Sequence, residues 1–467
     1  MISMRDAGSA GGLGTLSAFR HGFYDCLRRR ADALFEVCDA VLCADGPVGS
    51  LVGLSLAVEH RRGHGALYDA VNAGRMQVQR LRRELASLPL PRDAAGRIVL
   101  AVDVSNWLRP DAATAPDRSF CHVYGRGKSA AQMIPGWPYS FVAALEPGRT
   151  SWTGMLDAVR LGPLDDQSLV TAGQVRAVVE RLREAGQWAE GDPPILVVFD
   201  AGYDLTRLAF LLAEVPVVVA GRLKSDRVFH LPAPAREPGQ VGRTRRHGPV
   251  IDLDRPDTHP AAAVSTISDT SRYGQAFADA WDGAHQQLQR RGGWADYEGQ
   301  LPTVEGTLIR LVVDRLPGDR SPKPVWLWCS ALGLDAGEVD RIWRAYLRRF
   351  DVEHTFRLFK QTLGWTKPRI RDPHAADRWT WLTMVAYTQL RLARDLTADL
   401  RRPWERPAAD PGRLTPARVR RGFRHLRGKL PVPGPVRRNP PAQARAVRPA
   451  HGTSTSSPTH RSARPNT

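Results

Sequence analysis

The sequence predicts an α/β fold, and three stretches of the chain indicate it. Residues 98–102 and 195–199 are uninterrupted apolar runs, IVLAV and ILVVF, and each is followed directly by an aspartate, Asp103 and Asp200. Such runs are typical of central strands that are covered on both faces. After the second aspartate the chain turns into a predicted helix over residues 204–214. Strands alternating with helices are the pattern of an α/β sheet.

The two aspartates are candidate functional residues because of where they stand. We expect Asp103 and Asp200 each to lie where a buried strand ends, so that the carboxylates reach the edge of the sheet. The alternative for either one is a structural role, since an acid after a strand is often the N-cap of the next helix.

A third acid belongs to a helix-like stretch over residues 342–363. Within it Tyr346, Arg349, Glu353 and Lys360 follow the spacing Y-x2-R-x3-E-x6-K. On one continuous helix these side chains project within an arc of roughly 60°. One face would then carry a carboxylate, two cations and a phenol, which can bind a metal ion and a phosphate together. The alternative is a solvated helix with ordinary i,i+4 ion pairs.

Together these residues resemble a known family. Asp103, Asp200 and Glu353, with the Y-R-E-K set around the last, are similar to the DDE transposases of bacterial insertion sequences, over roughly residues 95–390. The resemblance implies an RNase H-like mixed sheet flanked by helices, with Asp103 on the first strand, Asp200 on the fourth and Glu353 on a later helix. It also implies a β-rich insertion over residues 222–330, where short apolar runs alternate with Pro, Gly and Asp.

The implied organisation has five parts. The N-terminal helices are either a DNA-end recognition region, as in related transposases, or a helical cap packed on the core. The tail combines many Pro and Arg residues with few large apolar ones, and we expect it to be largely disordered. The parts are residues 1–94 (N-terminal helical region), 95–221 (first part of the catalytic core), 222–330 (insertion subdomain), 331–400 (core completed by the Glu353 helix) and 401–467 (basic tail).

The resemblance also implies an activity. Asp103, Asp200 and Glu353 would hold two Mg²⁺ ions, which Mn²⁺ can replace, for phosphodiester cleavage at the ends of the element and strand transfer into target DNA. No covalent protein intermediate is implied. The implied partners are double-stranded DNA and a second copy of the chain when the ends are synapsed.

Five further residues would contact DNA. Arg349, Lys360 and Tyr346 would hold phosphate oxygens. Arg222, just beyond the fifth strand, resembles a family position that contacts DNA near the cut. Trp326 resembles a tryptophan that stacks an extruded base when the element leaves through a DNA hairpin; the alternative is packing in an apolar strand.

Charge and composition agree with a polyanionic partner. The chain has a net charge of +18, and residues 401–467 carry 16 Lys or Arg against Glu405 and Asp410, a balance of +14. Within that tail, residues 415–430 predict a short basic helix that would lie along a phosphate backbone. A bias towards arginine, 60 against 6 lysines, would also make a tail basic without selection for DNA.

The apolar runs and the cysteines of the sequence indicate where the protein is located. The sequence has no run near 18 apolar residues and no secretory segment, so we expect no membrane partner and a bacterial cytoplasmic location, at the nucleoid when bound to DNA. Five cysteines without a C-x2-C pair favour reduced thiols. Two other functions stay open: a transposase-derived DNA-binding protein without cleavage, and another RNase H-like nuclease.

Overall fold

Three parallel strands form the centre of a mixed sheet. The computed structural model has β3 (Val99–Leu108) pairing in parallel with β7 (Ile195–Phe199), and β7 pairing in parallel with β8 (Val217–Arg222). The first two are the strands predicted from the apolar runs. The difference is that β3 continues beyond Asp103, because residues 103–108 keep an antiparallel partner in β5 after the pairing with β7 has ended.

The sheet has ten strands within the described residues. Their order is β11-β12-β13-β14-β8-β7-β3-β5-β4, with β6 also pairing with β5. The segment β6-β5-β3-β7-β8 is antiparallel on one side of β3 and parallel on the other, which is the RNase H-like arrangement that was predicted. The remaining strands are β4 (Ser119–Val123), β5 (Gln132–Leu145), β6 (Thr153–Arg160), β11 (Val264–Thr270), β12 (Gly274–Ala284), β13 (Gly306–Val313) and β14 (Val325–Cys329).

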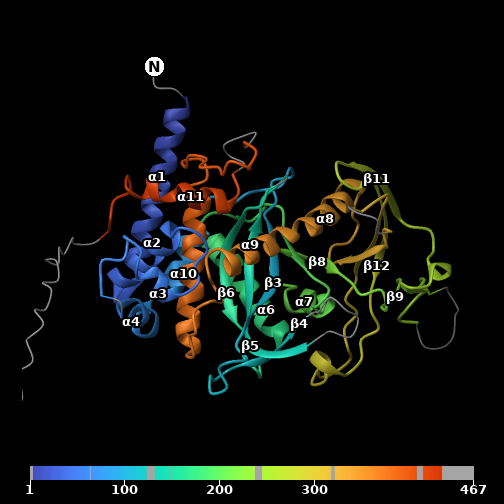
Figure 1. Cartoon of the computed structure of the whole chain (residues 1–467). Helices are drawn as coiled ribbons and strands as arrows, with labels where there is room; N and C mark the ends of the chain where they lie inside the picture. The colour runs from blue at the N-terminus through green and yellow to red at the C-terminus, as the bar shows by residue number, and fades with distance from the viewer. Residues whose placement is uncertain are drawn as a thin grey trace, which may run out of the picture. The chain divides into compact units, whose positions relative to one another are not determined.

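The predicted insertion is β-rich, and it extends the central sheet. Its last strand, β14, pairs antiparallel with β8, so residues 222–330 continue the hydrogen-bonded ladder of the core. Figure 1 shows the strands of residues 222–330, coloured from yellow-green to gold, beside the core strands. A separate hairpin pairs β9 (Val228–His230) with β10 (Val250–Asp252), and the short 3-10 turns are η1 (Pro256–Thr258) and η2 (Gly292–Trp294).

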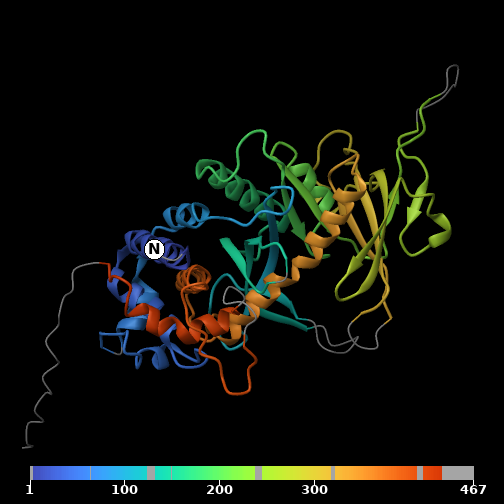
Figure 2. The same cartoon turned by 90° about the horizontal axis from the view of Figure 1, so that it is seen from above.

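Side chains alternate between two apolar clusters, one on each face of the sheet. On β3, Val99 and Ala101 belong to one cluster, and Leu100 and Val102 belong to the other. The helices α6 (Gln167–Glu184) and α7 (Leu205–Leu211) contribute to the second cluster. The helices α8 (Ala336–Arg348), α9 (Phe350–Gln361) and α10 (Pro373–Leu392) contribute to the first. Figure 2 shows α8 and α9 along one side of the strands and α6 on the other. The central strands are therefore covered on both faces.

The stretch predicted as one helix consists of two. Arg349 separates α8 from α9, and its backbone amide donates to the carbonyls of both Ala345 and Tyr346, with N···O distances of 3.2 and 3.0 Å. Since Arg349 itself stays in the right-handed helical region, with φ −49° and ψ −31°, the two helices follow each other closely (Figure 1).

The N-terminal helices pack on α10. Buried Arg20 of α1 bonds to Asp39 of α2 at 2.7 Å and to Gln389 of α10 at 2.5 Å. This packing is that of the helical cap, and recognition of DNA ends by the same helices stays a prediction. The elements of this region are α1 (Met4–Cys26), β1 (Leu27–Arg29), α2 (Ala31–Cys43), α3 (Leu51–Leu54), α4 (Ala66–Ala73), β2 (Arg75–Met76) and α5 (Val78–Ala86).

The basic helix predicted near the C-terminus is present as α11 (Pro416–Arg427), but it does not lie free. Val419, Phe423 and Leu426 are buried, and α11 packs on α2. Arg424 pairs with Glu59 at 3.3 Å, and Arg427 pairs with Asp39 at 2.6 Å. The prediction of an unstructured tail is thus corrected for residues 414–433. Residues 408–413 and 434–467 of that tail lie outside the described residues.

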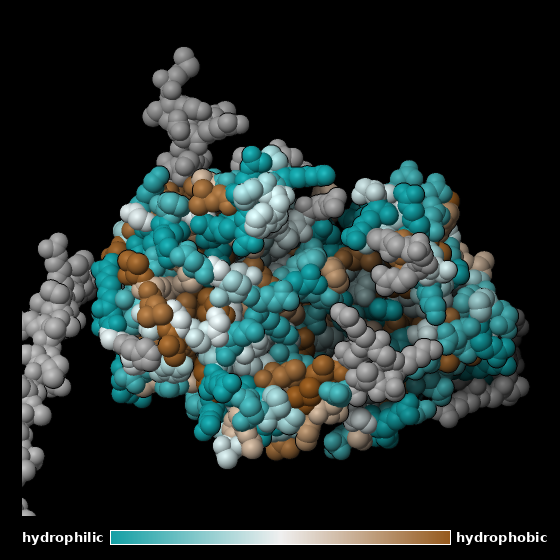
Figure 3. All heavy atoms as spheres, viewed as in Figure 1, coloured by the Kyte–Doolittle hydropathy of each residue, from teal (hydrophilic) through white to brown (hydrophobic). Residues whose placement is uncertain are grey.

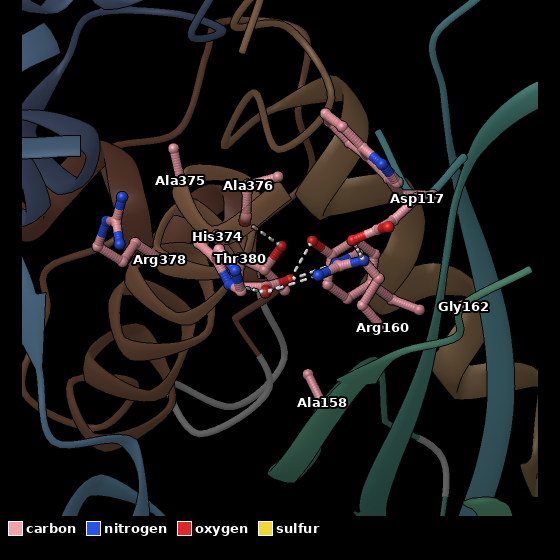
Figure 4. A network of polar contacts seen from close by, with 12 residues as sticks. Asp117, Ala158, Arg160, Gly162, His374, Ala375, Ala376, Arg378 and Thr380 are labelled. Atoms are coloured by element: carbon pink, nitrogen blue, oxygen red, sulfur yellow. Dashed lines mark hydrogen bonds and ion pairs between the residues drawn. The ribbon is translucent and has the colours of Figure 1, made fainter. Parts of the chain in front are cut away.

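Polar bonds tie α10 to the sheet. The Tyr139 hydroxyl of β5 donates to Asp377 of α10 at 2.7 Å, and Arg160 of β6 donates to the same carboxylate at 3.0 Å. Arg160 also reaches Asp117 at 3.4 Å. Figure 4 shows Arg160 between Asp117 and the helix that carries His374 and Thr380. These bonds fix α10, which follows the Glu353 helix in the chain.

The structure describes residues 4–63, 65–123, 132–148, 150–236, 245–316, 321–407 and 414–433, with side chains from residue 11 onwards. By their contacts, Met1–Val432 form one unit and Pro433–Thr467 a second. All five cysteines are free and buried, as expected for reduced thiols. None of the described helices is long and apolar enough to cross a membrane. The face shown in Figure 3 is mostly hydrophilic, with apolar atoms gathered in separate places.

Candidate active site

Strand alternation places the two aspartates on the same face of the sheet. Asp103 is in phase with Ala101 on β3, and Asp200 is in phase with Val198 on β7. Both apolar residues belong to the cluster that includes Phe356 of α9. The carboxylates therefore project to the side of the sheet that α8 and α9 cover.

Register makes the two aspartates neighbours. The last pair in the parallel ladder is Val102 and Phe199, so Asp103 and Asp200 are the next residue on each strand. Adjacent strands lie about 4.8 Å apart, which brings these carboxylates within reach of one cation. Asp200 follows the end of β7 as predicted, whereas Asp103 lies within β3, where the parallel pairing with β7 ends.

Glu353 reaches the same place from α9, and the guanidinium of Arg349 lies between the three acids. Nη1 of Arg349 is 2.7 Å from Asp103 Oδ2, and Nη2 is 3.2 Å from Glu353 Oε1 and 3.5 Å from Asp200 Oδ1. The Arg349 side chain is 9% exposed, whereas Asp200 and Glu353 are 42% and 43% exposed. One buried cation thus joins three carboxylates that come from three separate elements.

Burial and charge shape the protonation of this cluster. Burial raises the pKa of Asp103 to about 6, Arg349 opposes the shift, and the negative charge of Asp200 adds to it. For Arg349 burial alone would lower the pKa, but the carboxylates, Asp103 first, raise it above its ordinary value. Arg349 therefore stays charged.

Three more of the predicted residues lie around the acids. The Tyr346 hydroxyl is 3.5 Å from Asp200 Oδ1, and burial followed by the Asp200 charge raises the Tyr346 pKa, so the group remains a phenol that donates. Arg222 at the end of β8 lies close enough to Tyr346 to oppose that shift. Lys360 is a further cation, and its Nζ is 5.8 Å from the centre of the Trp365 ring. Burial lowers the pKa of Lys360, while the charge of Asp103 opposes this.

Trp326 is the predicted residue that the structure does not bring to the acids. It is 3% exposed, and its ring packs on Trp281 at 5.8 Å and on His259 at 5.2 Å. It belongs to the apolar cluster on the other face of the sheet, because β14 directs Leu327 and Trp326 to opposite faces. Base stacking by Trp326 stays a prediction, and it requires the ring to leave this cluster.

The donor set suits a hard divalent cation. Carboxylate oxygens are the ligands that Mg²⁺ and Mn²⁺ prefer, and Asp103, Asp200 and Glu353 already surround one positive charge. Across the described ranges, no three His, Cys, Asp or Glu side chains stand in an arrangement that would hold a metal ion as they are. For the acids the guanidinium of Arg349 explains this, because it separates the carboxylates and neutralises part of their charge. A metal ion would therefore require Arg349 to move.

One residue at the site was not singled out by the sequence pattern. Tyr203 lies in the turn after β7 and packs on Phe199, with ring centres 5.1 Å apart. Burial and then the charge of Asp103 raise its pKa well above the ordinary value. Its place behind Asp103 follows from the tertiary fold, and the spacing of Tyr203 after Asp200 is the only hint that the sequence offers.

Comparison with known protein families agrees with the predicted fold. A family model described as DDE superfamily endonuclease matches residues 22–287, more than half of the chain. The match includes Asp103 and Asp200 and ends before Glu353. No curated protein matches the chain.

Proposed function

Because the chain belongs to the DDE superfamily endonucleases, we propose that it is a transposase that cuts DNA at the ends of a bacterial insertion sequence and joins the freed ends to target DNA. Asp103, Asp200 and Glu353 are the proposed catalytic acids. The observation that carries the proposal is that all three contact one guanidinium, although 97 and 153 residues separate them along the chain.

The proposed cofactor is a pair of Mg²⁺ ions, which Mn²⁺ can replace, held by Asp103, Asp200 and Glu353. When bound, such ions supply the positive charge that stabilises the attacking and leaving oxygens of an in-line displacement at phosphorus. The support for this assignment is the donor set, which consists of carboxylates that already accommodate one cation.

The cationic residues of the site would hold the DNA backbone. Arg349 presents a planar fork that matches two phosphate oxygens, so a phosphate can replace its carboxylate partners. Lys360 adds a point charge, and Tyr346 donates one hydrogen bond as a neutral phenol. Arg222, which lies beside Tyr346, would extend the same surface along the strand.

The proposed reaction has two displacements. Water attacks the phosphodiester at the element's end and leaves a free 3′ oxygen, and that hydroxyl then attacks a phosphodiester of the target. Each step breaks one P–O bond and forms one, so no protein nucleophile is needed. We further propose that two copies act together on paired ends, and that the protein works in the bacterial cytoplasm, at the nucleoid when bound to DNA.

The experiment uses the full chain and a plasmid whose marker lies between the sequences that flank the gene. With Mg²⁺, wild type should cut at the two boundaries and join the fragment to a second plasmid. Glu353→Gln should lower cleavage at least about 100-fold and leave DNA affinity nearly unchanged, because the phosphate-holding cations remain. Lys360→Ala should weaken both, since a phosphate contact acts in the ground state and the transition state.

The experiment has a matched control variant and two outcomes that would contradict the proposed function. Glu180→Gln, which removes the same charge from the exposed surface of α6, should behave as wild type. Specific binding without cleavage in either Mg²⁺ or Mn²⁺ would indicate a transposase-derived DNA-binding protein. Cleavage that does not depend on the flanking sequences, and that is faster on RNA–DNA hybrids than on duplex DNA, would indicate another RNase H-like nuclease.

A further inference from the structure

Three histidines from separate segments meet in the insertion. His230 ends β9, His247 precedes β10, and His285 follows β12. Their ring centres are 5.0 Å apart for His230 and His247, 5.2 Å for His247 and His285, and 6.2 Å for His230 and His285. In Figure 1 the β9 and β12 labels lie in the β-rich half of the picture, apart from β3, which carries Asp103. The proposed catalysis does not use these rings.

The backbone holds two of the histidines together. The amide of His230 donates to the carbonyl of His285 at 2.8 Å, and the amide of His285 donates back at 2.9 Å. Gly283 shapes the approach: its φ is +70°, and a Cβ there would lie 2.4 Å from the Pro232 ring. The cluster therefore rests on regular backbone contacts between β9 and the end of β12.

The orientation of His285 is that of a metal ligand. Its ring is buried, and Nδ1 lies 3.0 Å from the Gly283 carbonyl. A carbonyl can only accept, so Nδ1 carries the proton and Nε2 keeps its lone pair. That Nε2 faces Nδ1 of His247 at 2.9 Å. Histidines that bind metals commonly donate their other ring N–H to a backbone carbonyl in this way.

The His230 ring supplies a second, independent observation that points to a bound ligand. Its Nδ1 is buried without a hydrogen-bond partner. An unsatisfied buried polar atom costs about 1–3 kcal/mol, so such atoms usually have a partner. A metal ion between the three rings would give the His230 ring one.

We propose that His230, His247 and His285 bind one divalent transition-metal ion, with Zn²⁺ as the ion that three imidazoles favour. The circle through the three ring centres has a radius of about 3.2 Å, the sum of a Zn–N bond of about 2.05 Å and the roughly 1.1 Å from an imidazole nitrogen to the ring centre. One point between the rings thus lies at the distance from all three ring centres that a coordinated ion would have. A water molecule would complete a tetrahedral site.

Binding requires two small changes. The proton that Nδ1 of His247 donates to Nε2 of His285 must move to the other ring nitrogen of His247, so that Nδ1 can bind the ion, and the His230 ring must turn. In the conformation described, the donor atoms of these side chains do not yet form a metal-holding group. A half-turn of the His230 ring about its Cβ–Cγ bond exchanges its nitrogens with carbons and leaves the ring centre almost in place. The ion would then join the segment between β9 and β10 to the end of β12, and so stabilise the insertion.

The test uses the full chain, freed of any affinity tag and stripped with a chelator. The protein is titrated with Zn²⁺, and separately with Co²⁺, in excess Mg²⁺ to occupy the carboxylate site. We expect one Zn²⁺ per chain, a rise in the unfolding temperature, and the strong visible absorption of tetrahedral Co²⁺. His247→Ala and His230→Gln should each weaken binding by more than the about 10- to 100-fold that loss of a mere supporting bond causes.

His259→Gln is the matched control. His259 lies in the same insertion, and its Nε2 contacts the Asp252 carbonyl at 2.8 Å, so its loss should leave Zn²⁺ affinity and the Co²⁺ spectrum unchanged. Far-UV circular dichroism of every variant separates misfolding from loss of a ligand. Absence of a stoichiometric Zn²⁺ site in folded wild type, or equal binding by wild type and His247→Ala, would overturn the proposal.

Discussion

The guanidinium of Arg349 lies 2.7 Å from the carboxylate of Asp103. Arg349 stands at the junction of α8 and α9, and Asp103 stands on the central strand, so this ion pair joins the helix that carries Glu353 to the sheet. The same guanidinium contacts Asp200 and Glu353. In the protein without DNA, Arg349 therefore occupies the space that a divalent cation needs.

This pair predicts an exchange of partners when metal and DNA bind. Arg349→Gln removes the competing positive charge, so the affinity for Mn²⁺ without DNA should rise about 10-fold, the effect of roughly 1.4 kcal/mol. Cleavage of DNA should fall, because the phosphate loses its planar partner. Calorimetric titration with Mn²⁺ and a cleavage assay measure the two effects.

Arg344→Gln is the control for Arg349→Gln. Arg344 is also on α8, but it pairs with Asp340 at 3.2 Å, on the insertion side. That variant should change neither Mn²⁺ affinity nor cleavage. If Arg349→Gln left Mn²⁺ affinity unchanged, Arg349 would not compete with the metal.

A second prediction concerns stability and pH. Burial raises the pKa of Asp103 to about 6, above its value in the unfolded chain, so the contribution of Asp103 to stability is present below pH 4 and is lost as the pH rises through 6. With a chelator at pH 8, Asp103→Asn should be more stable than wild type, by up to about 3 kcal/mol. The difference should vanish near pH 4. Urea unfolding across this pH range measures it.

The exposed Asp395→Asn should show no such trend. Excess Mg²⁺ at pH 8 should reverse the order, because the metal stabilises only the protein that keeps its carboxylate. A variant that is less stable than wild type at every pH would mean that the ion pair with Arg349 outweighs the cost of burying the Asp103 charge.

The place of both aspartates could be predicted from the sequence because buried strands have a strong local pattern. Uninterrupted apolar runs mark the strands, and the residues that follow the two runs are neighbours because the strands pair in parallel. The break between the two helices at Arg349 could not be predicted in this way. No Gly or Pro marks the junction of α8 and α9, so the spacing predicted a single helix. Tyr346, Arg349 and Glu353 nevertheless lie close together, because the two helices follow each other closely.

Tertiary contacts account for what the pattern did not reveal. Val419, Phe423 and Leu426 stand at helical spacing, but the basic composition around them favoured an exposed helix, and only the packing on α2 shows the buried face. Separations of 17 and 38 residues along the chain likewise hide the approach of His230, His247 and His285.

Trp326 offers a third prediction. Because it is buried against Trp281 and His259, Trp326→Ala should cost about 3–5 kcal/mol in the free energy of unfolding. Trp326→Phe keeps an aromatic ring and should cost less. If Trp326→Phe also leaves hairpin products on DNA unchanged, packing explains the residue. Trp404→Ala, at a position 75% exposed, is the control and should leave stability unchanged.

The last prediction separates the contribution of α11 from that of residues 434–467. Deleting residues 434–467 removes six arginines and no acid, and the unfolding temperature should not change, since large apolar residues are scarce there. Deleting residues 410–467 also removes α11, exposes the surface that Val419, Phe423 and Leu426 cover, and should lower the unfolding temperature by several degrees, the effect of about 2–3 kcal/mol or more.

The effect of the two deletions on DNA binding should differ from their effect on the unfolding temperature. The arginines of α11 are paired, for example Arg418 with Asp399 and Arg421 with Glu405, so they are poorly placed to release counterions from DNA. Deleting residues 434–467 should then account for most of the loss of non-specific affinity, and should reduce the slope of log K against log salt by up to about 5. An unchanged slope would mean that these arginines record a bias in composition, and that Arg222, Arg349 and Lys360 hold the DNA without them.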